Sequence, residues 1–210
     1  MLIAIIGDKG SGKSLTAVRL IVDKPNVFAF TNFSVMNIKH AQRLKFTDII
    51  EEKLLVIGKK EKIVKDINWQ FWRDVRKEHP YFCIFLDEIH NIAHARRGMS
   101  STSVLLSKWI SQIRKILADS EHNHLYIISQ EARKIDVDFR DLLDMIIKCQ
   151  AIIKGKGKDK RHYVKLSFYD NINDYAQNIK RRTSIIFRAE KYYKYYDTRE
   201  FISFGDDEYI

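Results

Sequence analysis

The sequence is poor in cysteine, proline and glycine, and it has no long apolar run. Only two cysteines, two prolines and eight glycines occur among its 210 residues. These counts exclude a disulfide-rich secreted domain and a proline- and glycine-rich disordered chain. No apolar stretch approaches the roughly 20 residues of a membrane-spanning helix, and no secretory signal precedes the first expected strand. A chain of this length can bury one good core, so we expect one α/β domain with an appendage.

The two cysteines and the net charge indicate a compartment and a class of partner. Cys83 and Cys149 both lie inside apolar, strand-like runs, so we expect reduced core residues and an intracellular protein. Lysine and arginine outnumber the acidic residues to give a net charge of +10. That excess favours a polyanionic partner, although a generally lysine-rich soluble protein would show it too.

The first fourteen residues carry the pattern that organises the chain. The apolar run Leu2–Ile6 leads into G-x-x-x-x-G-K-S, and residues 15–22 follow with a helical pattern. This is the strand–loop–helix context of a phosphate-binding P-loop. Lys13 can reach the β- and γ-phosphates, and the Ser14 hydroxyl can bind Mg²⁺. The pattern predicts an ATP-binding NTPase whose loop residues are Gly7, Asp8, Lys9, Gly10, Ser11, Gly12, Lys13 and Ser14.

Two later strands are expected to end in polar residues beside this loop. The apolar run 81–86 closes in Asp87-Glu88, which is the Walker B pattern. Asp87 would hold Mg²⁺, and Glu88 would orient and deprotonate the attacking water. Gln130 follows the apolar run 125–129 and could touch the γ-phosphate or that water, although an ordinary strand-terminal Gln is the alternative.

The rest of the sequence allows only an approximate assignment of strands and helices. We expect strands at 27–30, 54–57, 145–153, 162–169 and 184–188, with helices at 47–52, 67–77, 136–143 and 171–182. After Ser101 a helix with an apolar stripe is expected, with Lys108, Arg114 and Lys115 opposite that stripe. His90 and His94 are four residues apart, but no third ligand accompanies them, so core or surface roles are favoured over a metal site.

A basic, glycine-bearing turn stands between the last two long strands. Its cationic residues are Lys154, Lys156, Lys158, Lys160 and Arg161. We expect an exposed β-hairpin whose tip contacts the DNA backbone, and the alternative is a solvated hairpin that aids solubility. The composition changes at this turn, which divides the chain into an ATPase core, residues 1–153, and an appendage packed on it, residues 154–210.

The combination of motifs resembles one family. The P-loop, the stretch from Asp87-Glu88-Ile89-His90-Asn91 to Arg96-Arg97, Ser129-Gln130 and the late Tyr196-Asp197-Thr198 are similar to FtsK/HerA-type P-loop ATPases. The branch they resemble is the viral one, which comprises genome-packaging ATPases and zonula-occludens-toxin-like assembly ATPases of filamentous phages. The likeness covers roughly residues 1–150 and the late Tyr-Asp-Thr.

The resemblance carries further expectations. It implies a RecA-like, mostly parallel sheet flanked by helices, ATP and Mg²⁺ as cofactors, and a ring homo-oligomer, pentameric or hexameric, that moves double-stranded DNA. It also implies an arginine finger from the neighbouring subunit, for which Arg96, Arg97, Arg114 and Arg140 are candidates. A capsid or portal protein is a further possible partner. The expected location is the host cytoplasm and, transiently, the assembling virion.

Three functions are therefore weighed. The leading hypothesis is a motor that packages or translocates double-stranded viral DNA. The alternative is a phage-assembly ATPase that acts mainly on protein partners, although toxin-like members carry a transmembrane segment that is not found here. A small-molecule kinase of the P-loop type is disfavoured, because Glu88 is placed to activate water.

Overall fold

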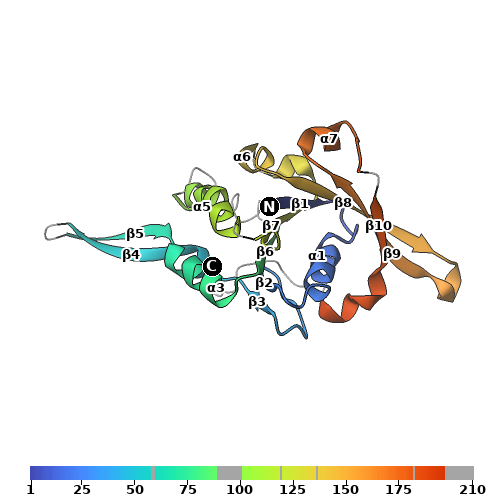
Figure 1. Cartoon of the computed structure of the whole chain (residues 1–210), viewed down its shortest axis with the longest axis horizontal. Coiled ribbons are helices and arrows are strands. Elements are labelled where there is room, and N and C mark those ends of the chain that lie inside the picture. Colours follow the sequence, from blue (N-terminus) through green and yellow to red (C-terminus); the bar gives the residue numbers. More distant parts are fainter. Residues whose placement is uncertain (58–59, 89–100, 119, 136, 182, 197–210) are drawn as a thin grey trace.

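One large sheet organises the fold. The computed structural model describes residues 1–57, 60–88, 101–118, 120–135, 137–181 and 183–196. Its eight-stranded sheet has the order β10-β9-β8-β1-β7-β6-β2-β3, with β4 and β5 as a separate pair (Figure 1). The strands of the large sheet are β1 (Leu2–Ile6), β2 (Phe28–Thr31), β3 (Ala41–Arg43), β6 (Phe82–Asp87), β7 (His124–Ser129), β8 (Met145–Lys154), β9 (Arg161–Tyr169) and β10 (Ser184–Arg188).

The strands from β8 to β3 run parallel, whereas β9 and β10 are antiparallel additions at one edge. β1 pairs in parallel with β7 on one side and β8 on the other, and β6 pairs in parallel with β7 and β2. β9 pairs antiparallel with β8, and β10 with β9. The mostly parallel α/β sheet flanked by helices confirms the expected fold class.

Helices cover both faces of the sheet, and alternating side chains on β1 explain why. Leu2, Ala4 and Ile6 enter the core beneath α3 and α5, whereas Ile3 and Ile5 enter the core beneath α1. A strand that is buried on both faces reads as a continuous apolar run, as β1, β6 and β7 do. The helices are α1 (Lys13–Val22), α2 (Phe46–Ile49), α3 (Trp69–Glu78), α5 (Ser101–Leu117), α6 (Val137–Arg140) and α7 (Ile172–Ala176).

Large aromatic side chains fill the core beneath α3 and α5. Trp72 from α3 and Trp109 from α5 are both fully buried, and their ring centroids are 5.4 Å apart. Phe30 of β2 packs edge-on against Trp72. Removing either indole ring would cost about 3–5 kcal/mol of stability. Parallel pairing of β7 with both β1 and β6 brings the ends of these three strands to one edge.

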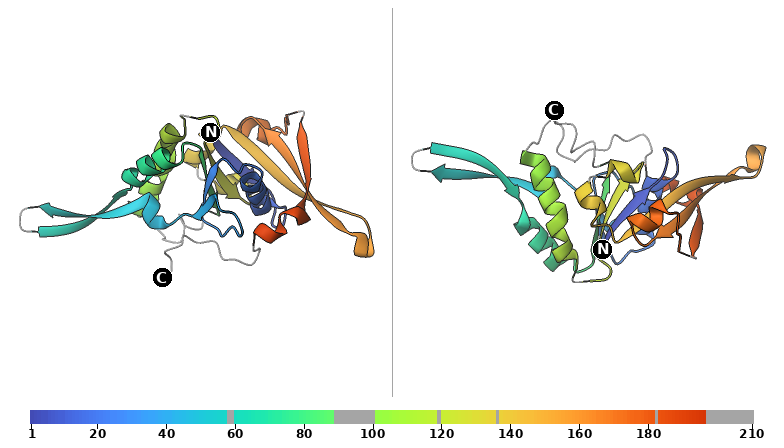
Figure 2. Two further views of the ribbon diagram at one scale, coloured as in Figure 1. Left: turned by 60° about the horizontal axis from the view of Figure 1, so that its bottom comes forward. Right: turned by 90° about the horizontal axis from the view of Figure 1, so that it is seen from above.

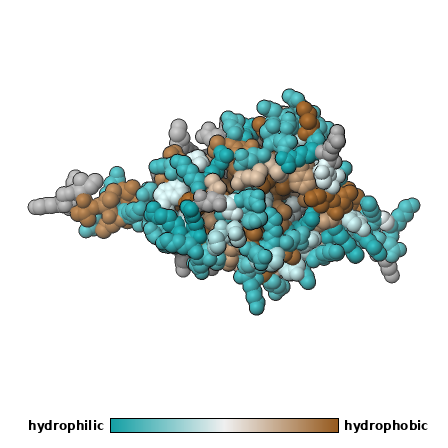
Figure 3. All heavy atoms as spheres, in the orientation of Figure 1, coloured by the Kyte–Doolittle hydropathy of each residue, from teal (hydrophilic) through white to brown (hydrophobic). Residues whose placement is uncertain are grey.

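Two hairpins extend from opposite ends of the molecule (Figures 1 and 2). One is the arm, defined as β4 (Ile50–Ile57) with β5 (Lys60–Ile67). The other is the outer part of β8 and β9, which continues beyond the end of β1. The arm carries exposed apolar side chains, since Leu54 is 59% exposed and Val56 and Ile63 are each 63% exposed (Figure 3).

The segment after β10 folds back toward α1 as two short 3₁₀ turns, η3 (Ala189–Lys191) and η4 (Tyr193–Tyr195). The hydroxyl of Tyr192, between the turns, donates to the carboxylate of Asp23 at 3.0 Å. Two further 3₁₀ turns, η1 (Ala132–Lys134) and η2 (Gly157–Asp159), lie in connections. None of the helices among the described residues is long and apolar enough to cross a membrane.

Several expected elements were wrong in extent. The helix expected over 171–182 ends after Ala176, because Asn178 adopts φ 57 and the Ile179 N–H donates to the Asp174 carbonyl, which terminates the helix. The strand expected at 54–57 is the outer half of β4, and its partner β5 was not anticipated. The short strand β3 was also missed.

Candidate nucleotide-binding and catalytic site

The predicted P-loop and Walker B residues lie at one edge of the sheet, because four parallel strands end there. β1 leads into the P-loop, β6 ends at Asp87, β7 ends at Ser129, and β2 ends at Thr31. Ligands of open α/β sheets bind beyond the carboxyl ends of the strands, where side chains from separate strands can reach one molecule. This edge is therefore the candidate site.

The P-loop needs glycine at both of its ends. Gly7 has φ 152, and a Cβ there would come within 2.5 Å of the Cys149 carbonyl oxygen. Gly12 has φ 91, and a Cβ there would come within 2.5 Å of Cγ2 of Val164. Both positions combine a backbone conformation that glycine favours with close contact to β8 or β9. The loop is therefore closely packed on its strands at both ends.

Lys13 begins α1 and turns its ammonium group into the loop. Its Nζ donates to the carbonyl oxygens of Gly7 at 3.0 Å and Asp8 at 3.2 Å, and the residue is 8% exposed. The Ser11 N–H donates to the Asp8 carbonyl at 3.0 Å, which closes the turn. A positive charge thus lies among backbone groups at a helix N-terminus, where phosphate groups bind.

Ser14 and Asp87 form the candidate Mg²⁺ site. The Ser14 hydroxyl donates to Oδ2 of Asp87 at 2.6 Å. Oδ1 of Asp87 is buried and has no hydrogen-bond partner among the described residues. A hydroxyl and a carboxylate with an unused oxygen suit a hard cation such as Mg²⁺, so these two residues fit the ion. Elsewhere in the described part of the chain, no cluster of three His, Cys, Asp or Glu side chains could hold a metal.

Burial perturbs the Asp87 carboxylate. The residue is 1% exposed, and loss of hydration raises the pKa of its carboxyl group to about 6. The hydrogen bond from Ser14 lowers that pKa, and the neighbouring Glu88 raises it. An ionised Asp87 is therefore costly without a cation beside it, and a bound Mg²⁺ would offset that cost.

Asn32 is a site residue that the sequence pattern did not reveal. It is fully buried at the end of β2, where its Oδ1 accepts from the Asp87 N–H at 2.7 Å. Its Nδ2 donates to the Asp87 carbonyl at 2.8 Å. The carboxamide thus fixes both backbone groups of Asp87. The available signal was a polar residue at the end of an apolar strand, the same signal that identified Asp87 and Gln130.

Glu88 and Gln130 follow their strands directly, as expected. Glu88 has φ 49, a left-handed conformation that costs a residue with a side chain about 1 kcal/mol or more. Its N–H donates to the Ile128 carbonyl at 3.1 Å, which ties it to β7. Gln130 follows Ser129, whose hydroxyl donates to the Glu131 carbonyl at 3.1 Å. Both positions lie at the edge that holds the P-loop.

Of the candidate arginines that the structure describes, Arg114 lies away from this edge. Arg114 of α5 pairs with Asp144 at 3.4 Å, and Asp144 also accepts from the Leu2 N–H at the start of β1. Arg114 therefore lies at the amino ends of the parallel strands, away from its own P-loop. Arg140 lies on α6. Arg96 and Arg97 lie outside the described residues, as do His90 and His94.

The basic turn occupies the predicted hairpin tip. β8 pairs with β9 out to Lys154 and Arg161, whereas β1 pairs with β8 only as far as Lys148. At about 3.3 Å per residue, β8 extends roughly 20 Å past the end of β1. The side chains of the tip that the structure describes are all exposed, and these are Lys154, Lys156, Lys160 and Arg161.

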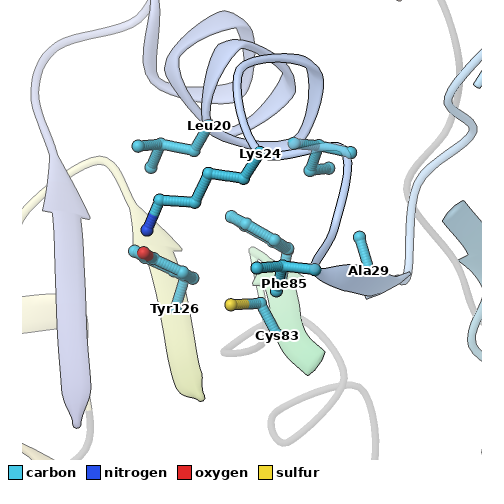
Figure 4. A pocket seen from close by; sticks show the side chains of 8 residues that line it. Leu20, Lys24, Ala29, Cys83, Phe85 and Tyr126 are labelled. Atoms are coloured by element: carbon cyan, nitrogen blue, oxygen red, sulfur yellow. The ribbon is translucent and has the colours of Figure 1, made fainter. Parts of the chain in front are cut away.

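Among the described residues, three hollows lie on or beside α1 and the P-loop. A pocket of about 410 Å³ adjoins Gly12, Lys13 and Ser14, and another of about 390 Å³ lies across the loop beside Lys148 and Gln150. The third lies beneath the end of α1, where Figure 4 shows Lys24 above Tyr126, Phe85 and Cys83. Its volume of about 10 Å³ has room for about one water molecule, which excludes a nucleotide.

Comparison with known proteins agrees with this geometry. Residues 3–151 match the model of the ATPase family associated with various cellular activities (AAA). The chain belongs to the AAA family. It is accordingly an ATPase of the P-loop type, and the cofactors of such enzymes are ATP and Mg²⁺. No curated protein sequence matches the chain significantly.

Three solved structures are similar to this chain. The N-terminal domain of zonular occludens toxin from Neisseria meningitidis has a TM-score of 0.53 and 14% identity, covering 93% of this chain and 98% of that one. A KaiC-like protein from Pyrococcus horikoshii has a TM-score of 0.49 and 11% identity, with 89% and 83% covered. The DNA-packaging ATPase from Sulfolobus turreted icosahedral virus has a TM-score of 0.46 and 14% identity, with 88% and 95% covered. At these identities the first likeness shows a shared fold.

Proposed function

We propose that this AAA ATPase is a motor that moves double-stranded DNA during assembly of a virus. The observation that carries the proposal is the basic hairpin, which begins at the P-loop and ends in an exposed cationic tip. Translocation needs contacts that ignore base sequence, and pairing of lysine or arginine with phosphates meets that need. The motifs that resemble viral packaging ATPases support the same function. The motor would work in the host cytoplasm and at the assembling virion.

The tip has the density of charge that a polyanion contact requires. Five lysine or arginine residues fall between positions 154 and 161, with Asp159 as the one acid among them. Gly155 and Gly157 have φ 91 and φ 56, which allows the sharp turn. Nζ of Lys154 lies 5.4 Å from the centre of the Tyr163 ring, which orients one of these charges at the base of the tip.

In this proposal the active form is a ring, a pentamer or hexamer, in which a neighbouring subunit supplies an arginine to the phosphates. Such an arginine is worth on the order of 10³–10⁵ in rate for P-loop enzymes. The specific ATPase activity should therefore rise with protein concentration. An alanine variant of Arg96, Arg97, Arg114 or Arg140 should recover activity when mixed with Lys13→Ala subunits, because each supplies the part that the other lacks. Full activity of the monomer, independent of concentration, would remove the ring from the proposal.

DNA binding is tested by comparing two variants that lose the same charge. In one, Lys156, Lys160 and Arg161 of the tip are changed to Gln, and in the other the exposed Arg73, Arg76 and Lys77 of α3 are changed to Gln. The slope of log affinity against log salt should flatten by about 0.9 for each phosphate that is no longer neutralised, and only in the tip variant. ATP hydrolysis without DNA should stay near the wild-type rate in both.

The outcome of that comparison is decisive in either direction. If the slopes of log affinity against log salt are equal in both variants, the hairpin only aids solubility. In that case the surface formed by Lys108, Arg114 and Lys115 would be the next DNA site to test. A wild-type ATPase rate that does not change when double-stranded DNA is added would count against DNA as the transported substrate.

The arm favours a second candidate function, a phage-assembly ATPase whose direct partner is a protein. Exposed apolar side chains on a projecting hairpin suit a protein contact better than a DNA backbone. Leu54, Val56 and Ile63 are each more than half exposed. Under this alternative, changing these three residues to Ser or Thr would abolish virus assembly. Double-stranded DNA would not stimulate ATP hydrolysis by the wild-type protein. A capsid or portal protein is the class of partner to test.

A further inference from the structure

The pocket of about 410 Å³ opens directly beside the start of α1. Gly12, Lys13, Ser14 and Leu15 line one side of it. The rest of the wall comes from the β8–β9 hairpin and from the segment after β10. The hairpin contributes Ala151, Ile152, His162, Tyr163 and Val164, and the later segment contributes Ala189, Tyr193 and Tyr196. A volume of this size is typical of small-molecule sites. The pocket therefore continues the phosphate-binding loop in the direction of the first turn of α1.

The aromatic wall of the pocket is firmly attached to the rest of the fold. The ring of Tyr196 packs edge-on against the fully buried Phe33, with centroids 5.9 Å apart. Tyr192, beside Tyr193, packs edge-on against Phe187 and hydrogen-bonds to Asp23. The backbone N–H of Met36 donates to the Tyr195 carbonyl at 2.9 Å. These contacts tie the segment after β10 to the end of α1 and to the chain that follows β2.

The lining of this pocket differs from that of the hollow across the loop. Leu15, Val164 and Ala189 present apolar surface. Three tyrosine rings, those of Tyr163, Tyr193 and Tyr196, and the imidazole of His162 also line the pocket. The hollow on the other side is lined by Asp8, Lys9, Gly10, Ser11, Lys148, Cys149, Gln150 and Ala151, which include no aromatic residue. Aromatic and apolar walls bind a flat heterocycle by stacking and contact. Of these two hollows, the first pocket alone offers such walls next to the P-loop.

We propose that this pocket holds the base and ribose of the nucleotide, with Tyr193 and Tyr196 as the residues that contact the base. The inference rests on ATP binding at the P-loop and adds the part of the site that recognises the nucleoside. Stacking does not depend on the hydrogen-bonding edge of the base. ATP and GTP should therefore bind with affinities within about tenfold of each other, because both purines present the same ring surface.

The test separates binding of the base from binding of the phosphates. Affinities are measured by titration calorimetry for two probes, the non-hydrolysable ATP analogue AMP-PNP and inorganic tripolyphosphate, each with Mg²⁺. Tyr193→Ala and Tyr196→Ala should each weaken AMP-PNP binding about tenfold, the loss expected for one stacking contact. Both variants should bind tripolyphosphate within twofold of the wild-type affinity. Tyr193→Phe and Tyr196→Phe, which keep the ring, should bind AMP-PNP like the wild type.

Tyr81→Ala is the matched control, because Tyr81 is 46% exposed, like Tyr193 at 45%, and lies before β6 at the other end of the strands. This control should bind both probes normally. Equal weakening of both probes in Tyr193→Ala would show a structural role and overturn the proposal, and so would unchanged AMP-PNP binding in both alanine variants. Should Tyr196→Ala fail to fold because it loses its packing against Phe33, the exposed Tyr193 still decides the question. Failure of the wild-type protein to bind either probe would instead count against nucleotide binding at the P-loop.

Discussion

Replacing Asp87 with Asn should stabilise the metal-free protein while it abolishes ATP hydrolysis. Asp87 is 1% exposed, and its pKa is raised from 3.8 to about 6 by burial. A difference of about two pKa units corresponds to about 3 kcal/mol of unfavourable free energy when the group is ionised. The Asn side chain carries no charge and can still accept from Ser14. Its amide group would have no partner at the Oδ1 position, which costs about 1–2 kcal/mol, so we expect a net gain of about 1–2 kcal/mol in the free energy of unfolding at pH 7.5.

The difference in stability between Asp87→Asn and the wild type should depend on pH. The folded-state pKa of Asp87 lies above the unfolded-state value, so the folded protein binds the proton more tightly. The cost of the ionised group is therefore fully present above about pH 6 and disappears below about pH 4. The advantage of Asp87→Asn should fall by about 2 kcal/mol and so disappear at pH 4.5, where the wild-type carboxyl is mostly protonated when folded.

Urea denaturation in EDTA at pH 7.5 and pH 4.5 measures both values for each protein. Asp74→Asn is the matched control, because contacts with Gln70 and Lys77 lower the pKa of the exposed Asp74. That variant should lose a little stability at pH 7.5 rather than gain any. The reasoning is refuted if Asp87→Asn is no more stable than the wild type at pH 7.5, or if its advantage is the same at both pH values.

Three further predictions concern the same site. Asn32→Ala removes both hydrogen bonds to the Asp87 backbone and leaves two buried backbone groups unpaired, so unfolding in urea should show a loss of about 2–4 kcal/mol together with reduced hydrolysis. Glu88→Gln should retain ATP binding and lose turnover, because the water loses its base, and a wild-type hydrolysis rate in this variant would make the assignment wrong. Gly12→Ala should weaken ATP binding measured by calorimetry, and Val164→Ala in the same chain should restore part of the loss by removing the contact at 2.5 Å, but not the strain at φ 91.

The sequence was sufficient wherever a feature depends on neighbouring residues. The P-loop is contiguous, and its strand and helix flank it directly, so eight positions sufficed to place Lys13 and Ser14 at the start of α1. Apolar runs located β6 and β7 to within one residue, because strands buried on both faces need no alternation. Asp87 and Glu88 followed from the end of one such run. The contact between Asp87 and Ser14 required only that parallel strands share an edge.

Features that depend on pairing between distant segments were missed. Asn32 acts on a residue 55 positions away, and nothing within β2 shows that β6 lies beside it in the sheet. β5 does not alternate between apolar and polar residues, because Ile63 and Val64 are adjacent within a run of lysine and acidic residues. Its pairing with β4 therefore could not be predicted from a period of two. The base pocket joins α1 to residues after position 188, and only the folded sheet brings them together.

Val164 lies on a strand that contacts the P-loop and also reaches the basic tip. The residue stands on β9, within reach of any side chain placed at Gly12, and the same strand runs back to Arg161 at the tip. β8 makes a second connection, since its Cys149 carbonyl contacts Gly7 and the strand ends at Lys154. Both strands of the hairpin are thus packed against the P-loop at their roots.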